Sequence, residues 1–297
     1  MAEENRRDYA IDTLRVLGLF LVILAHCSPS ETIFQLRQFD VTMLVFISGM
    51  SFSYSKSKID KSNYLNYVIK RFKRLVLPVW IFLVLYFTVF GLIMQESFSI
   101  GTIVSSFCLV NGIGFVWIFR VLFSVSLLNP LLEWIGDKCS NLKLFIGIIS
   151  LLIINEGFNY YLIHGIANEM IRDILSYTIA YTVGYGIISM MGIVWRKQTK
   201  TYKIGYFSVF LILFLVWGRL LLDNFPSLQL YKYPPTIYYI SYGMLFSIVL
   251  YELFSRIKHY SKTVVWLSKE TFTIYLIHII VLKVNSYMPF SSFMNVW

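Results

Sequence analysis

The chain has 297 residues, of which 57% are hydrophobic and only 14% are charged, whereas soluble domains carry about 25% charged residues. This composition excludes water as the main solvent of the folded chain. The net charge of +10 does not indicate nucleic-acid binding, because the basic residues lie in short segments between apolar runs and form no continuous stripe. The three cysteines show no short spacing, so we expect no metal site and no disulfide framework.

Apolar runs separated by charged or turn-forming residues predict helices along almost the whole chain. The nine expected helices cover residues 12–28, 40–55, 75–94, 115–133, 142–156, 172–191, 204–222, 235–254 and 264–286. We therefore expect an all-α fold, a polytopic transmembrane helical bundle of about nine to ten spans, with residues 1–297 forming a single domain. The segment 95–114 is too polar for a span and is expected to lie on the outer surface or to re-enter the bundle.

The distribution of basic residues predicts the orientation of the bundle. Most of the 26 Lys and Arg residues lie in alternate loops, near Arg6, Lys61, Lys138, Lys200 and Lys258. Cytoplasmic loops carry such an excess of positive charge. We therefore expect a multi-pass protein of the inner membrane with a cytoplasmic N-terminus.

The first helix carries three ionisable residues, which are costly inside a membrane and indicate function or a buried partner. Asp12 and Arg15 lie three residues apart at its inner start and can pair on one helix face. His26 lies fourteen residues after Asp12, which places it roughly 21 Å deeper. Asp12 therefore cannot orient His26, and a structural and a catalytic role for the Asp12–Arg15 pair are equally open.

The ninth helix repeats this depth pattern with His278. Thr271, Tyr275 and His278 fall at positions i, i+4 and i+7 and so share one helix face. An interhelical hydrogen-bond seam explains this face at least as well as direct chemistry by His278.

The inner start of the third helix is strongly basic, with Arg71 and Arg74 beside Lys70 and Lys73. Arginine forks suit phosphate oxygens, so this cluster can hold a nucleotide-bearing donor such as coenzyme A. A signal for membrane orientation explains the same charges.

Several short motifs together resemble the acyltransferase-3 family of integral-membrane O-acyltransferases. They occur in order along nearly the whole chain as Ile11-Asp12-Thr13-Leu14-Arg15 followed by His26, Phe46-Ile47-Ser48-Gly49, Arg71-Phe72-Lys73-Arg74 with Pro78, Trp117-Ile118-Phe119, and Tyr275-Leu276-Ile277-His278. The chain departs from the family's pattern at Ile118, and it ends soon after the ninth predicted span, where the family usually adds a tenth.

The resemblance implies that His26 is the essential histidine, that Arg15, Arg71 and Arg74 bind the donor, and that Ser48 lies on the path from donor to acceptor. It also implies transfer of an acyl group, most simply acetyl from acetyl-CoA or another acyl-CoA, to a hydroxyl of a cell-surface or lipid-linked carbohydrate. A histidine suits this reaction because its ordinary pKa of about 6.5 allows it to take the hydroxyl proton near neutral pH.

The remaining candidate residues are expected to orient the histidine or to line the substrate path. Asp40, at the outer start of the second helix, is a candidate to orient His26. The residues expected to be structural or substrate-lining are Asp12, Trp117, Arg120, Arg219, Lys232, Tyr275 and His278. A transporter or flippase for a small anion or glycolipid remains the alternative function, although we find no paired repeats of the kind that such folds often contain.

Overall fold

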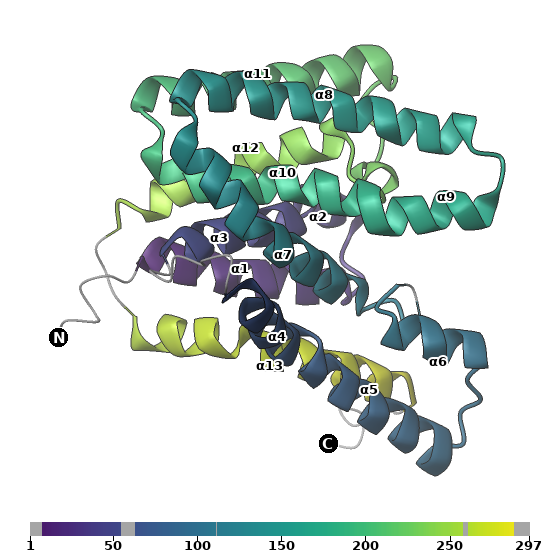
Figure 1. Cartoon of the computed structure of the whole chain (residues 1–297). Helices are drawn as coiled ribbons and strands as arrows, with labels where there is room; N and C mark the ends of the chain where they lie inside the picture. The colour runs from purple at the N-terminus through teal and green to yellow at the C-terminus, as the bar shows by residue number, and fades with distance from the viewer. Residues whose placement is uncertain (1–7, 55–62, 111, 258–260, 288–297) are drawn as a thin grey trace.

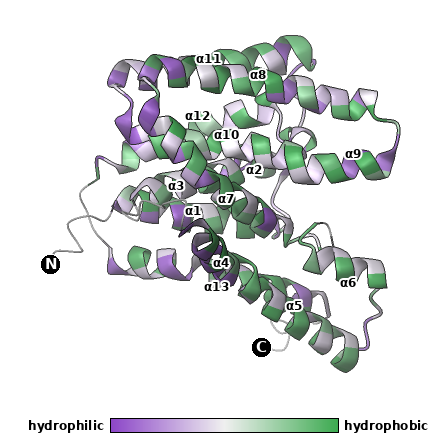
Figure 2. Ribbon diagram, in the orientation of Figure 1, coloured by the Kyte–Doolittle hydropathy of each residue, from purple (hydrophilic) through white to green (hydrophobic). Residues whose placement is uncertain are grey.

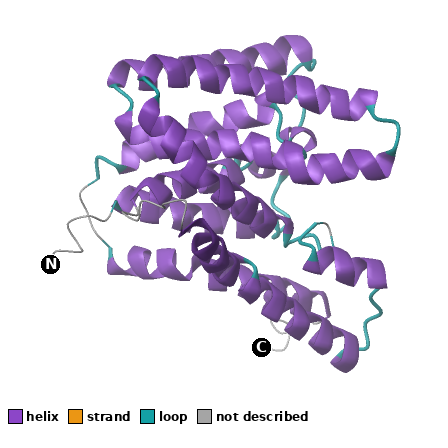
Figure 3. Ribbon diagram, in the orientation of Figure 1, coloured by secondary structure: helices purple, strands orange, loops and turns teal. Residues whose placement is uncertain are grey.

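The computed structural model describes residues 8–54, 63–110, 112–257 and 261–287. Helices make up this part of the chain and no β-strand occurs in it (Figures 1 and 3). Each of the nine predicted runs falls on a long helical segment. These segments are α1 (Tyr9–Ala25), α3 (Asp40–Tyr54), α4 (Tyr64–Leu75) joined to α5 (Leu77–Thr88) and η3 (Val89–Ile93), α7 (Trp117–Lys138), α8 (Asn141–Gly165), α9 (Glu169–Leu175) joined to η4 (Ser176–Ala180), α10 (Tyr181–Val194) and η5 (Trp195–Lys197), α11 (Lys200–Val216) with η6 (Trp217–Leu221), α12 (Ile237–Phe254) and α13 (Lys262–Tyr287).

Seven of these segments are long and apolar enough to cross a membrane. The other two, α1 and α3, have 17 and 15 residues, whereas a span needs about 20. Most of α3 is buried inside the bundle. The expected total of nine to ten spans therefore stays a prediction, while the helical membrane fold is clear.

The helices pack in layers with α1, α3 and α10 at the centre. In Figure 1, α8 and α11 form one outer layer, α10 and α12 the next, α1 and α3 the third, and α13 with α5 the opposite outer layer. The helix α3 contacts α1, α10 and α12, and α13 packs against α1. The two helices that carry the first sequence motifs thus lie in the interior.

Apolar side chains cover the outside of the bundle as they do in a membrane protein. Figure 2 shows hydrophobic residues along the outer helices. Among the large exposed hydrophobic residues are Leu92, Ile154, Ile212 and Val281. Such large apolar surfaces are unfavourable in water, so we expect them to contact lipid.

Two glycines allow α3 and α10 to lie in direct contact. A Cβ atom at Gly49 would lie 2.2 Å from the carbonyl oxygen of Ser189, and one at Gly192 would lie 2.0 Å from the carbonyl oxygen of Phe46. Only residues without a side chain permit this approach. The contact fixes α3 against the centre of the bundle.

The short helices lie at the ends of the bundle. They are α2 (Glu31–Leu36), α6 (Ile100–Phe107) and the 3₁₀ helix η7 (Leu228–Tyr231). The segment 95–114, whose path the sequence left open, contains α6. The basic residues Arg6, Arg7, Lys56, Lys58, Lys61 and Lys258 lie outside the described residues.

Candidate active site

Two histidines from the first and last long helices meet at one end of the bundle, which we call the histidine end. His26 follows the last residue of α1, and its backbone N–H donates to the carbonyl oxygen of Ile23 at 2.9 Å. The ring centroids of His26 and His278 are 5.5 Å apart, and the Phe115 ring lies 4.8 Å from His26. His26 is exposed, whereas His278 is buried. His26 is therefore the histidine that a substrate can reach.

A cavity of about 250 Å³ opens beside His26. It is lined by residues of α1, α2, α3, α7, α13 and η7, and of the segments that follow α1, α2 and η7. The polar and aromatic residues among them are His26, Phe34, Arg37, Asp40, Trp117, Gln229, Lys232, Tyr233 and Tyr275. Five residues singled out in the sequence, His26, Asp40, Trp117, Lys232 and Tyr275, thus line one cavity.

The cavity wall contains two buried cations and one buried carboxylate. Arg37 Nη1 donates to Asp40 Oδ2 at 2.5 Å, and Lys232 Nζ lies 3.8 Å from Asp40 Oδ1. All three side chains are at most 5% exposed. Burial lowers the pKa of the Lys232 ammonium, but Tyr239, Asp40 and Tyr233 raise it by more, so its pKa lies above the ordinary value. Two basic side chains thus face one carboxylate in this wall.

Asp40 is bound to these cations rather than to His26. Its Oδ1 accepts the backbone N–H of Val41 at 2.7 Å and its Oδ2 accepts from Arg37. No hydrogen bond joins the described side chains of Asp40 and His26. The role of Asp40 in orienting His26 stays a prediction, and Arg37, which sequence reasoning did not single out, is its direct partner.

His278 has one ring nitrogen engaged and one without a partner. Nδ1 is hydrogen-bonded to the carbonyl oxygen of Tyr275, and because a carbonyl only accepts, Nδ1 carries the proton. Nε2 is buried and has no hydrogen-bond partner among the described residues. Tyr275 in turn donates to the carbonyl oxygen of Phe115 at 2.7 Å. The face of α13 that carries Tyr275 and His278 thus points into the bundle.

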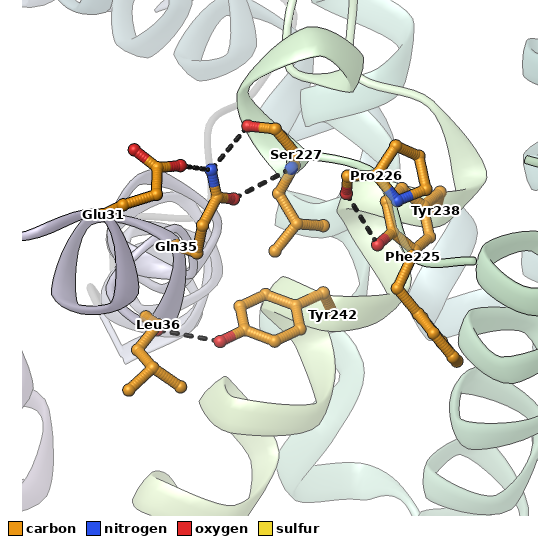
Figure 4. A pocket seen from close by; sticks show the side chains of 9 residues that line it. Glu31, Gln35, Leu36, Phe225, Pro226, Ser227, Tyr238 and Tyr242 are labelled. Atoms are coloured by element: carbon orange, nitrogen blue, oxygen red, sulfur yellow. Dashed lines mark hydrogen bonds between the residues drawn. The ribbon is translucent and has the colours of Figure 1, made fainter. Parts of the chain in front are cut away.

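The helix α2 separates the catalytic cavity from a second hollow. Phe34 and Arg37 face the His26 cavity, while Gln35 lies on the opposite side in a pocket of about 400 Å³ (Figure 4). Gln35 Nε2 donates to Ser227 Oγ at 2.5 Å, and Gln35 Oε1 accepts the backbone N–H of Leu228 at 3.0 Å. These bonds hold α2 against the segment that carries Lys232.

Polar residues of α8, which sequence reasoning missed, fix the turn that carries Lys232. Asn155 and Asn159 each donate to the carbonyl oxygen of Pro235 at 3.1 Å. Glu156 accepts the backbone N–H of Ile237 at 2.7 Å. Three polar residues at i, i+1 and i+4 inside an apolar run were the available signal.

The basic residues of the donor motifs gather around the far end of α3. Arg15 Nη2 donates to Ser51 Oγ at 2.6 Å, and its Nη1 lies 3.6 Å from Asp12 Oδ1. Asp12 also accepts from Ser268 of α13 at 2.6 Å. The Asp12–Arg15 pair expected from the sequence therefore forms and ties α1 to α13.

Arg71 approaches the same end of α3 from α4. Its guanidinium lies 5.9 Å from the ring centre of Phe52, the residue after Ser51, and 5.0 Å from that of Tyr67. Arg74 is exposed one turn later, and the half-buried Ser48 lies on α3 one turn before Ser51. Arg15 therefore contacts Ser51, and Arg71 lies near the next residue, Phe52. We call this end of the bundle the basic end.

Two expected substrate-lining residues lie away from the cavity. Arg219 is part of η6 and donates to Asn224 Oδ1 at 2.5 Å. Arg120 lies on α7 between the rings of Tyr177 and Tyr181. In the described part of the chain, no group of three or more His, Cys, Asp or Glu side chains is placed to hold a metal ion.

Comparison with known proteins identifies the family of the chain. The family model for the acyltransferase-3 acyltransferase domain matches residues 8–296. The chain belongs to the acyltransferase-3 family. No curated protein and no solved structure matches the chain. Family membership and the apolar helices together make this protein a multi-pass membrane acyltransferase, and an acyltransferase-3 protein uses an acyl donor.

Proposed function

We propose that this acyltransferase transfers an acyl group, most simply acetyl, from acyl-CoA to a hydroxyl of a cell-surface or lipid-linked carbohydrate. The observation that carries the proposal is the exposed His26 at a cavity whose wall holds the buried charges of Arg37, Asp40 and Lys232. An acyl transfer needs a base for the attacking hydroxyl and positive charge for the developing oxyanion. This cavity offers both.

In the proposed step, the acceptor hydroxyl oxygen attacks the thioester carbon while His26 takes its proton. The carbonyl oxygen becomes negatively charged and faces Arg37 and Lys232. The carbon–sulfur bond then breaks, the new ester forms, and the protonated His26 gives its proton to the departing thiolate. Each group thus returns to its initial state.

The donor is proposed to bind at the basic end through its phosphates. Arg15, Arg71 and Arg74 supply the cationic groups, and Ser51 of α3 accepts from Arg15, with Ser48 one turn earlier on the same helix. Arg15 and His26 are eleven residues apart on α1, which corresponds to roughly 16 Å along the helix. The acyl arm of coenzyme A would cross this distance inside the bundle.

We further propose that the basic end faces the cytoplasm and the histidine end faces outward in the inner membrane. Lys197 ends η5, Lys200 and Lys203 lie in the first turn of α11, and Lys138 ends α7. Cytoplasmic ends of spans carry such charges. The donor site would then meet cytoplasmic acyl-CoA.

The test is acyl transfer by the purified full chain in membrane vesicles supplied with labelled acetyl-CoA and an extract of surface carbohydrate. We expect the label to enter the carbohydrate with wild-type protein and not with His26→Gln. Surface glycans from cells with and without the gene should differ by acetyl groups in their mass spectra. Uptake of labelled solute without any acyl transfer would overturn the proposal in favour of transport.

A further inference from the structure

Arg120 is a half-buried arginine whose guanidinium nitrogens, Nε, Nη1 and Nη2, are buried without a hydrogen-bond partner among the described residues. It forms no ion pair with a described carboxylate. Its guanidinium lies 4.8 Å from the ring centre of Tyr177 and 5.2 Å from that of Tyr181. Buried donors without acceptors are costly, and an ionisable group inside a membrane span marks a functional site by default.

Arg120 lies directly behind the aromatic wall of the catalytic cavity. Trp117, which lines the cavity, precedes it by one turn of α7, about 4.5 Å along the axis. The Trp117 and Tyr181 rings are 6.3 Å apart, and the Tyr181 ring stacks on Tyr233, another lining residue. One ligand can therefore place one of its groups at Arg120 and a neighbouring group in the His26 cavity.

The covering tyrosine belongs to an irregular segment of helix. Tyr177 lies in the π-helical segment η4 between α9 and α10. Such π-helical turns occur frequently at functional sites. The surface beside it carries three exposed isoleucines, since Ile171, Ile174 and Ile179 are 50%, 54% and 44% exposed, together with the exposed Asp173. An apolar chain can lie against this surface with a charged group directed at Arg120.

We propose that Arg120 binds the phosphate of a lipid-linked carbohydrate acceptor. This inference rests on the proposed function and narrows it: the sugar would occupy the His26 cavity, the phosphate would meet Arg120, and the lipid chain would lie along α9 and η4. A guanidinium offers a planar fork that matches phosphate oxygens. A water-soluble sugar would leave the Arg120 donors unpaired, which is why a lipid-linked acceptor fits better.

The test measures binding, so it does not depend on acyl transfer. The full chain is placed in nanodiscs of phosphatidylcholine and titrated with a long-chain isoprenyl phosphate and with the matching uncharged isoprenol. Wild-type protein should bind the phosphate about 10- to 100-fold more tightly, as expected for charge-assisted bonds. Arg120→Gln should remove this difference, and Arg120→Lys should keep part of it because it keeps the charge without the fork.

The control variant is Arg256→Gln, since Arg256 is an exposed arginine just beyond the end of α12, and it should bind as wild type does. Equal binding of phosphate and alcohol by wild type would overturn the proposal. So would complete displacement by phosphatidylglycerol at equal mole fraction, which would assign the site to ordinary phospholipid, or by inorganic phosphate, which would make the lipid chain irrelevant. If the protein transfers acyl groups to carbohydrate but binds isoprenyl phosphate and isoprenol equally, this inference alone is wrong. If it prefers the phosphate but transfers no acyl group, the proposed function alone is wrong.

Discussion

The rings of His26 and His278 lie 5.5 Å apart although 252 positions separate them in the chain. His26 is exposed at the cavity, whereas His278 is buried and hydrogen-bonded to the backbone of its own helix. We therefore propose different roles for the two histidines: the reachable ring takes a substrate proton, and the buried ring supports the wall behind it.

Replacing His26 with Gln should slow acyl transfer by about 10²- to 10⁴-fold, the usual contribution of a general base. Glutamine keeps a hydrogen bond but cannot take a proton. His278→Gln should keep at least about a tenth of the rate, because that ring only supports His26. Transfer to surface glycan is measured in cells that contain equal amounts of each variant. If His278→Gln proves the more damaging change, the proton is removed by His278 instead.

Replacing both Arg71 and Arg74 with Gln should weaken acyl-CoA binding while the protein still inserts. Loss of charge-assisted phosphate contacts costs about 1.5 to 3 kcal/mol each. The control is Lys70→Gln with Lys73→Gln, which removes two exposed charges of the same helix without touching the arginine forks. Calorimetric titration with acetyl-CoA compares the two double variants. Equal affinities in both would show that α4 contributes charge alone.

Asp40→Asn should destabilise the protein by about 3 to 5 kcal/mol, because Arg37 and Lys232 would remain buried without a counter-charge. Asp137→Asn is the matched control, since Asp137 forms its salt bridge with Lys197 at the exposed surface, where a pair contributes about 0 to 1 kcal/mol. Thermal unfolding in detergent reports both. A melting temperature for Asp40→Asn equal to that of the control would mean that the three buried groups are not a coupled unit.

Gly49→Ala should destabilise the bundle strongly, since the added Cβ would lie 2.2 Å from a backbone oxygen of α10. Gly147→Ala, on α8, places its Cβ in open space with no atom within 4 Å and should be neutral or slightly stabilising, because alanine favours helix. The yield and melting temperature of the two variants decide the matter. An unaffected Gly49→Ala protein would show that α3 and α10 are not in close contact.

A cysteine placed at position 200 should be protected from a membrane-impermeant thiol reagent in intact cells, whereas one at position 227 should react. The background protein has Cys27, Cys108 and Cys139 replaced by Ser. Opening the cells should expose position 200. Labelling of position 200 from outside would reverse the proposed orientation and move the donor site away from the cytoplasm.

The sequence predicted the helices well because their apolar runs are long, and it predicted the depths of His26 and His278 because depth follows from helical rise. It could not predict that Lys232 contacts Asp40, because 192 positions separate the two residues. The Arg37–Asp40 pair was missed although these residues are only three positions apart. The burial of α3 inside the bundle could not be predicted either, because burial among other helices gives the same apolar pattern as contact with lipid. Asn155, Glu156 and Asn159 visibly interrupt an apolar run, but their partners could not be predicted because they are backbone atoms of a distant turn.

The helices α1 and α3 set the same separation between the basic end and the histidine end. On α1, Arg15 and His26 are eleven residues apart, and on α3 the same interval separates Asp40 in the cavity wall from Ser51, the partner of Arg15. Both helices are rigid along this interval, so each sets the same separation of roughly 16 Å. A donor held at Arg15 by its charged end must present its reactive carbon at that distance, and a compact acyl phosphate is too short to do so.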